Sequence, residues 1–134
     1  MFRLRSELGL DSIIIDTHPG LSEDTLLAIA ACDTSILLTR VDRQDFEGTA
    51  ITLEITKRFG RESFLIVTMA PPRISPEIIK AEVERVFGRP VLGVVPFNED
   101  VLEASRTREL FALTRPDHSF SKVIYNIANQ IVGL

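Results

Sequence analysis

Four short apolar runs recur along the chain, separated by longer stretches of mixed polarity. They cover residues 13–16, 36–39, 64–67 and 91–95. The runs are continuous rather than alternating and are rich in β-branched residues, which is typical of strands covered on both faces of a parallel sheet. The pattern therefore predicts strands that alternate with covering helices.

Helical patterns fill the intervals between these runs. Ser22 is followed by two acidic residues, which suits the capped amino end of a helix. Pro76 follows Ser75 and precedes an acid, another start signal. In the last segment, apolar residues recur with the i, i+3, i+4, i+7 spacing of a helix packed on a core. The predicted helices cover residues 22–31, 46–59, 75–87, a shorter stretch from 98, and 120–132.

The alternation of strands and helices predicts an α/β fold with right-handed crossovers. We expect three layers, with a mainly parallel sheet of about four strands flanked by helices, forming a single domain over residues 1–134. Ligands of such sheets bind at the carboxyl ends of the strands. The segments to consider are therefore residues 16–20, 40–45, 68–73 and 96–100.

Charge, the length of the apolar runs and the cysteine count exclude several classes of protein. The net charge of -4 and the pI near 5.2 argue against direct nucleic-acid binding and against an anionic-membrane surface. No apolar run approaches the ~20 residues that cross a bilayer, and residues 1–5 lack the apolar stretch of a signal peptide. Cys32 is the single cysteine, which suits a reducing cytoplasm. We therefore expect a cytoplasmic protein without a membrane anchor.

The end of the first apolar run carries the most informative chemistry. Asp16 is placed where a carboxylate can hold Mg²⁺ beside a nucleotide phosphate, usually through water. Gly20 allows the backbone to approach a phosphate closely. Many α/β strands end in a polar residue, so a structural role for Asp16 and a metal-facing role are equally consistent with this pattern alone.

Several motifs, taken in order, resemble the MinD/ParA family of P-loop ATPases (the SIMIBI class). Residues 13–21 read Ile-Ile-Ile-Asp-Thr-His-Pro-Gly-Leu and resemble the family's Walker B strand and switch II. Residues 38–49 are similar to the segment after the next strand in one MinD-like branch. Residues 93–101 read Gly-Val-Val-Pro-Phe-Asn-Glu-Asp-Val and resemble the stretch by the nucleotide base. The chain is identified as similar to the carboxyl-terminal half of such an ATPase, which is half of a P-loop NTPase fold.

The resemblance implies a set of site residues, a metal and a nucleotide. By analogy, Mg²⁺ is held by Asp16 and ATP is the family's nucleotide. Family members commonly place an asparagine at the end of the third of these strands, against adenine, where this chain has Thr68. The remaining nucleotide-binding positions, vestigial or by analogy, are Gly20, Pro96, Asn98 and Glu99.

The phosphate-binding loop of the family, Walker A, has no counterpart in these residues. Such a loop needs glycines whose amides converge on phosphate and a lysine that follows a glycine. None of the seven glycines here precedes a lysine, and the three lysines, Lys57, Lys80 and Lys122, fall in predicted helices. A lone Asp16 cannot replace that cradle in phosphoryl transfer. We therefore expect no ATPase activity and no bound cofactor in isolation.

Two functions follow from this incomplete resemblance. The first is a non-catalytic binding or assembly module of the family that positions division machinery, chromosomes or other cargo. The alternative is one half of a split Mg-ATPase that another chain completes. A receiver-like signalling domain with Asp16 as phospho-acceptor is disfavoured, because no second acid and no lysine accompany that residue.

A sheet without its phosphate-loop strand would expose an apolar edge, and such edges promote association. We therefore expect a homo-oligomer, most simply a dimer, or pairing with a MinD/ParA-like partner chain. The charged loop with Arg40, Asp42, Arg43 and Asp45 is either a solvated loop or a partner contact. His18 and His118 lack the companions of a zinc site.

Overall fold

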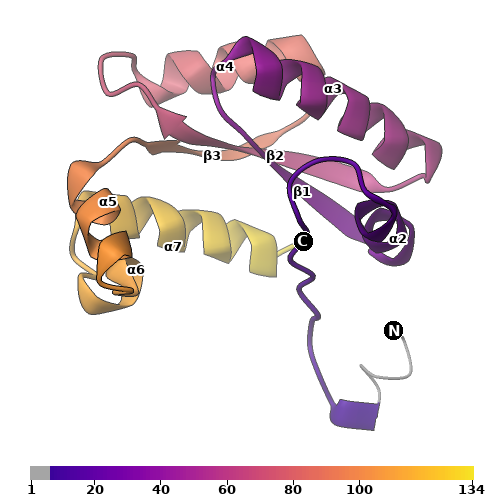
Figure 1. The fold of residues 1–134 in the computed structure, drawn as a ribbon, viewed down its shortest axis with the longest axis horizontal. Helices are drawn as coiled ribbons and strands as arrows, with labels where there is room; N and C mark the ends of the chain where they lie inside the picture. The colour runs from indigo at the N-terminus through magenta and orange to yellow at the C-terminus, as the bar shows by residue number, and fades with distance from the viewer. Residues whose placement is uncertain (1–6) are drawn as a thin grey trace.

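The computed structural model describes residues 7–134, which form one parallel sheet with helices on both of its faces (Figure 1). The expectation that residues 1–5 are not a signal peptide lies outside this range. The α/β fold class predicted from the sequence is confirmed. In chain order the elements are α2 (Glu23–Ala31), β1 (Thr34–Thr39), α3 (Arg43–Arg58), β2 (Glu62–Ala70), α4 (Pro76–Phe87), β3 (Val91–Pro96), α5 (Glu99–Arg106), α6 (Phe111–Thr114) and α7 (Ser119–Val132).

The sheet has the order β1-β2-β3, and both pairs of neighbours are parallel. The central strand β2 aligns Phe64 with Ile36 of β1 and Val67 with Val94 of β3. Because all strands run the same way, their carboxyl ends lie at one edge of the sheet, beside α5 (Figure 1). That edge is where the sequence predicted a site.

One predicted strand is not present. Residues 13–16 form no ladder with any described strand, and the side chain of Ile14 is 87% exposed. A strand is held by hydrogen bonds to a neighbour, and β1 pairs only with β2. The sheet over residues 7–134 therefore has three strands rather than about four.

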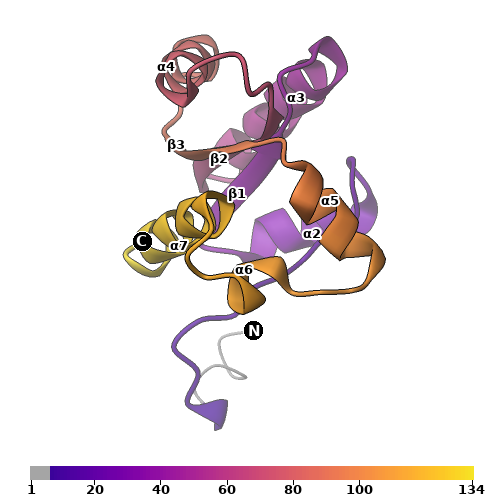
Figure 2. The same cartoon turned by 90° about the vertical axis from the view of Figure 1, so that its left-hand side faces the viewer.

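Apolar side chains of β2 point alternately to the two faces of the sheet, and each set belongs to one of two hydrophobic core clusters. Leu65 and Val67 pack with residues of α3 and α4, whereas Phe64 and Ile66 pack with residues of α7. Figure 2 shows the three layers end-on, with α3 and α4 on one side and α7 on the other. Coverage of both faces is the physical reason why these strands are continuously apolar.

The layer formed by α7 lies very close to β3. A Cβ atom at Gly93 would meet Cγ1 of Ile127 at 2.5 Å. Gln130 also donates a hydrogen bond to the carbonyl oxygen of Leu92 at 2.8 Å, which ties the same helix to the same strand. Glycine at position 93 therefore allows this close approach.

Most helix starts follow the sequence signals. Ser22 accepts a hydrogen bond from the amide of Thr25, and Asn98 accepts one from the amide of Val101. Ser75 precedes α4 as expected, although its hydroxyl donates to Glu77 instead of capping the helix. The short helix α6 was not predicted.

Candidate functional site

The carboxyl ends of β2 and β3 meet at an irregular point of the sheet. The register shifts between Val67 and Ala70, and Met69 has a positive φ of 51°. The amide of Phe97 donates to the carbonyl oxygen of Ala70 at 2.9 Å, which closes the two strands just beyond this bulge. Bulges often redirect side chains next to functional sites. Thr68 lies within this bulge, and Pro96 pairs with Ala70.

Asn98 and Glu99 follow directly at the start of α5. The side-chain oxygen of Asn98 is 3.1 Å from the amide of Val101, so it caps the helix. Glu99 is exposed in the first turn. The structure therefore brings three sequence-predicted positions to one edge, since Pro96 ends β3 immediately before them.

The predicted metal residue lies on a different segment. Asp16 is exposed and makes no hydrogen bond or ion pair with any described residue. Gly20 has a φ of 90°, and its carbonyl oxygen accepts a hydrogen bond from the hydroxyl of Thr25 at 3.1 Å. Both residues precede α2 on a segment that has no pairing with the sheet. Among the described residues, no hydrogen bond or ion pair joins them to the cluster at β2 and β3.

An ion pair organises the charged loop after β1. The guanidinium of Arg40 donates to both carboxylate oxygens of Asp45, at 2.9 and 3.0 Å. The backbone amide of Arg40 donates to the same carboxylate at 3.0 Å. These hydrogen bonds lower the pKa of Asp45 below its usual value. Asp42 caps α3 by accepting a hydrogen bond from the amide of Asp45, so hydrogen bonds hold the loop while most of its side chains stay exposed.

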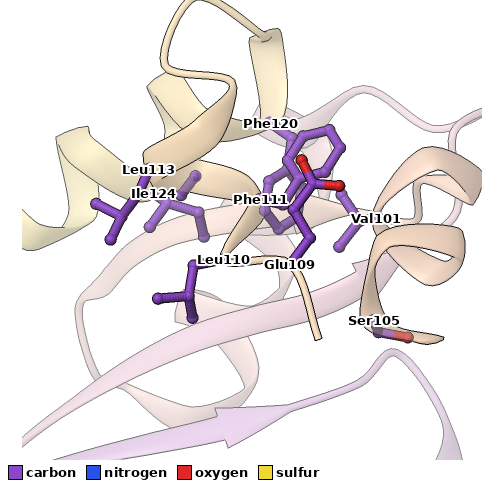
Figure 3. A pocket seen from close by; sticks show the side chains of 9 residues that line it. Val101, Ser105, Glu109, Leu110, Phe111, Leu113, Phe120 and Ile124 are labelled. Atoms are coloured by element: carbon purple, nitrogen blue, oxygen red, sulfur yellow. The ribbon is translucent and has the colours of Figure 1, made fainter. Parts of the chain in front are cut away.

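An open apolar hollow lies between α5, α6 and α7, with a volume of ≈ 350 Å³ (Figure 3). Phe111 is buried in it, while Leu110, which precedes α6, and Leu113 on α6 are exposed. The carboxylate of Glu109 is held at the rim by Arg115 at 3.1 Å. The hollow is therefore a surface feature with few free polar groups. Its other lining residues are Val101, Ser105, Ala112, Phe120 and Ile124.

No family model matches the chain. It is 26% identical over 124 residues to an uncharacterized ATP-binding protein of Methanocaldococcus jannaschii, covering 92% of this chain and 47% of that protein. It is 25% identical over 130 residues to a putative septum site-determining protein MinD of Emiliania huxleyi, again covering 92% of this chain and 47% of the relative. The chain thus spans about half the length of the curated relatives that it matches.

Solved structures of MinD and ParA proteins are also similar to this chain. The MinD cell division protein of Aquifex aeolicus superposes with a TM-score of 0.82 at 15% identity, covering 99% of this chain and 58% of that one. The resemblance to MinD/ParA-type ATPases is confirmed. A ParA family ATPase from Chlorobium tepidum gives a TM-score of 0.72 at 22% identity, covering 96% of this chain and 53% of that one. The fold is therefore that of a MinD/ParA P-loop NTPase over about half of its length.

Lysine positions and acidic clusters bear on whether the described residues of this MinD/ParA-like chain could hold a nucleotide with magnesium. Lys57, Lys80 and Lys122 lie within α3, α4 and α7, as predicted, and none follows a glycine. Within residues 7–134 no group of three or more His, Cys, Asp or Glu side chains is arranged to hold a metal ion. Asp16 alone offers one carboxylate, which Mg²⁺ accepts only together with other oxygen ligands.

The sequence analysis did not predict two of these features, the Arg40–Asp45 ion pair and the apolar hollow. The bidentate pair of Arg40 and Asp45 has the i, i+5 spacing of a loop followed by a helix, which no simple pattern signals. The hollow of Figure 3 depends on α6, whose start at Phe111 has no side-chain cap.

Within residues 7–134, no helix is both long and apolar enough to cross a membrane.

Proposed function

We propose that this chain is a non-catalytic binding or assembly module of the MinD/ParA type, acting in the cytoplasm in the positioning of cell-division machinery or other cargo. It retains the family-like sheet and the positions by which the family would contact a nucleotide base. It does not contribute the glycine–lysine cradle that stabilises a transferring phosphoryl group.

The observation that carries this proposal is the separation of the candidate residues. Pro96, Asn98 and Glu99 lie together at the carboxyl edge, but Asn98 is already used as a helix cap. Asp16 lies on a segment that pairs with no described strand, and it belongs to no described group of three or more His, Cys, Asp or Glu side chains. No glycine in the sequence is followed by a lysine, and Lys57, Lys80 and Lys122 lie within α3, α4 and α7.

The test is ATP binding and hydrolysis by the purified chain with Mg²⁺. We expect neither binding at micromolar ATP nor hydrolysis above the rate without protein. Asp16→Ala is the informative variant, and Asp33→Ala is its matched control, since Asp33 is also exposed but precedes β1 at the opposite end of the strand. Micromolar binding that Asp16→Ala weakens and Asp33→Ala does not would overturn the proposal.

A second candidate function is one half of a split Mg-ATPase, with Mg²⁺ and ATP as cofactors of the completed assembly. It is supported by the extent of the match, since relatives aligned over 92% of this chain have about as much sequence again. On this alternative, a MinD/ParA-like partner chain supplies the phosphate loop. Asp16 would hold magnesium, and Gly20, Thr68, Pro96, Asn98 and Glu99 would line the nucleotide. ATP hydrolysis that arises only on mixing with such a partner, and is lost in Asp16→Ala, would favour it over the first.

A further inference from the structure

Three helices meet at one corner of the molecule, where α5, α6 and the first turn of α7 lie together (Figures 1 and 2). His118 lies in this corner, with its ring nearly perpendicular to that of Phe111 on α6 and the ring centroids 5.0 Å apart. Phe111 is buried and also meets Phe120 of α7 at 5.8 Å. The aromatic contact holds the imidazole in place, while the His118 side chain stays 28% exposed, so protons from solvent can reach it.

The two ring nitrogens of His118 make different contacts. Nδ1 accepts a hydrogen bond from the backbone amide of Phe120 at 3.1 Å, so the side chain caps α7. Nε2 lies 3.8 Å from a carboxylate oxygen of Asp100 on α5. A ring nitrogen that accepts a hydrogen bond carries no hydrogen of its own. The cap therefore requires a neutral ring whose hydrogen is on Nε2.

These two contacts favour opposite charge states of the ring. The cap needs the free lone pair of Nδ1, which protonation removes. The carboxylate of Asp100 attracts a charged ring more strongly than a neutral one. Histidine is the side chain whose charge ordinarily changes between about pH 5 and pH 8. Uptake of one proton therefore weakens the contact with α7 and strengthens the contact with α5.

We propose that His118 is a pH-sensitive latch between α5 and α7. In its neutral form, the ring caps α7. When it takes up a proton, the ring releases the amide of Phe120 and forms an ion pair with Asp100, which loosens the first turn of α7. Asp100 directly follows Glu99 in the first turn of α5, so the latch lies beside the candidate edge of the sheet. The latch goes beyond the proposed function and does not depend on it, because its contacts join described residues only.

The other charged groups near this corner do not replace Asp100. Among residues 7–134, Asp100 is the one carboxylate in ion-pair contact with the His118 ring. Arg115 lies 4.8 Å from the centre of the Phe111 ring, and its charge is offset by its ion pair with Glu109. The remaining charged side chains of these helices and of the turns between them are exposed and make no ion pair with the ring: Glu99, Glu103, Arg106, Arg108, Asp117 and Lys122.

Nuclear magnetic resonance of the isotope-labelled chain tests the latch directly. The sequence contains two histidines, and His18 is the internal reference because it is exposed and has no hydrogen bond or ion pair with any described residue. As His118 takes up its proton, the protection of the Phe120 amide against hydrogen exchange, corrected for the intrinsic rate, should fall roughly fivefold, the loss expected for a helix cap. Protection that stays constant while the ring titrates overturns the proposal, as does a hydrogen on Nδ1 at about pH 8.

Two histidine variants locate the response. His118→Asn is the informative one, because asparagine caps helices well and carries no titrating group. In this variant, the protection of the Phe120 amide should stay constant between about pH 8 and pH 5. His18→Asn is the matched control and should leave the response of the wild type intact. A response that persists in His118→Asn, or disappears in His18→Asn, overturns the proposal.

Asp100→Asn tests the second contact. Without this carboxylate, the protonated ring has no ion-pair partner, so the folding equilibrium constant should fall about twofold to fivefold further between pH 8 and pH 5 than in the wild type. Urea unfolding at each pH measures it. In the His118→Asn background, Asp100→Asn should leave the pH dependence unchanged, because carboxyl groups ordinarily titrate below this range. Glu103→Gln is the matched control and should behave as the wild type. Equal pH dependence in Asp100→Asn and the wild type overturns the proposal.

Discussion

The contact between Gly93 and Ile127 gives the sharpest test of how the layers pack. In Gly93→Ala, the new methyl carbon would lie 2.5 Å from Cγ1 and 2.6 Å from Cδ1 of Ile127. Favourable carbon–carbon contacts need about 3.5–4.0 Å, so the overlap is roughly 1 Å. The helix cannot move away freely, because Ile127 is buried in the core cluster and Gln130 is bonded to Leu92. We expect a loss of about 1–3 kcal/mol in the free energy of unfolding, as for other overpacked cores.

Urea unfolding followed by circular dichroism measures this loss. With a denaturant slope of about 1–3 kcal/mol per M, the midpoint should fall by roughly 1 M. Gly48→Ala is the control, because Gly48 is exposed in α3 with open space around it, and this change should stabilise the protein by about 1 kcal/mol. Both variants add one methyl group, so their opposite signs isolate the steric clash.

A double-mutant cycle tests the cause. Ile127→Ala alone should cost about 2–5 kcal/mol, because it removes a buried side chain. Combined with Gly93→Ala, the total should be smaller than the sum by about 1–3 kcal/mol, because the added methyl then has room. Strict additivity, or a Gly93→Ala variant as stable as the wild type, would refute the close packing of α7 on β3.

Two further predictions concern loops at the carboxyl edge of the sheet. Hydrogen bonds from Arg40 lower the pKa of Asp45 in the folded protein. The stability that the Asp45 carboxylate contributes is therefore present above its unfolded pKa of about 3.9, and it is lost as the pH falls through the lower folded pKa. Asp45→Asn should therefore show a smaller fall in urea midpoint than the wild type between about pH 5 and pH 2; identical pH profiles would contradict the ion pair. Asn98→Ala should lower the unfolding free energy by about 1 kcal/mol by removing the cap of α5, whereas Asn98→Asp should retain most of it, and equal losses in thermal unfolding would argue against capping.

The candidate site was only partly readable from the sequence. The family resemblance placed Pro96, Asn98 and Glu99 after a strand, and β3 does end at Pro96, whereas their role toward a nucleotide stays a prediction. The pairing of Arg40 with Asp45 was not predicted, because it depends on the turn between β1 and α3. The roles of Asp16 and Gly20 stay predictions, since neither has a hydrogen bond or ion pair to the cluster at β2 and β3.

The α/β class, the strands that form β1, β2 and β3, and most helix boundaries could be predicted from the sequence alone, together with a fourth strand at residues 13–16 that does not form. Those features depend on local patterns: continuous apolar runs for strands covered on both faces, caps such as Ser22, and the spacing of apolar residues in α7. Whether each apolar run has a neighbouring strand depends on the tertiary structure. Residues 36–39 and 13–16 have similar composition, yet only the first forms a strand, because β2 lies beside it. A strand is stabilised by hydrogen bonds to a neighbouring strand. The sequence of one segment therefore does not show whether a segment distant in sequence will lie beside it.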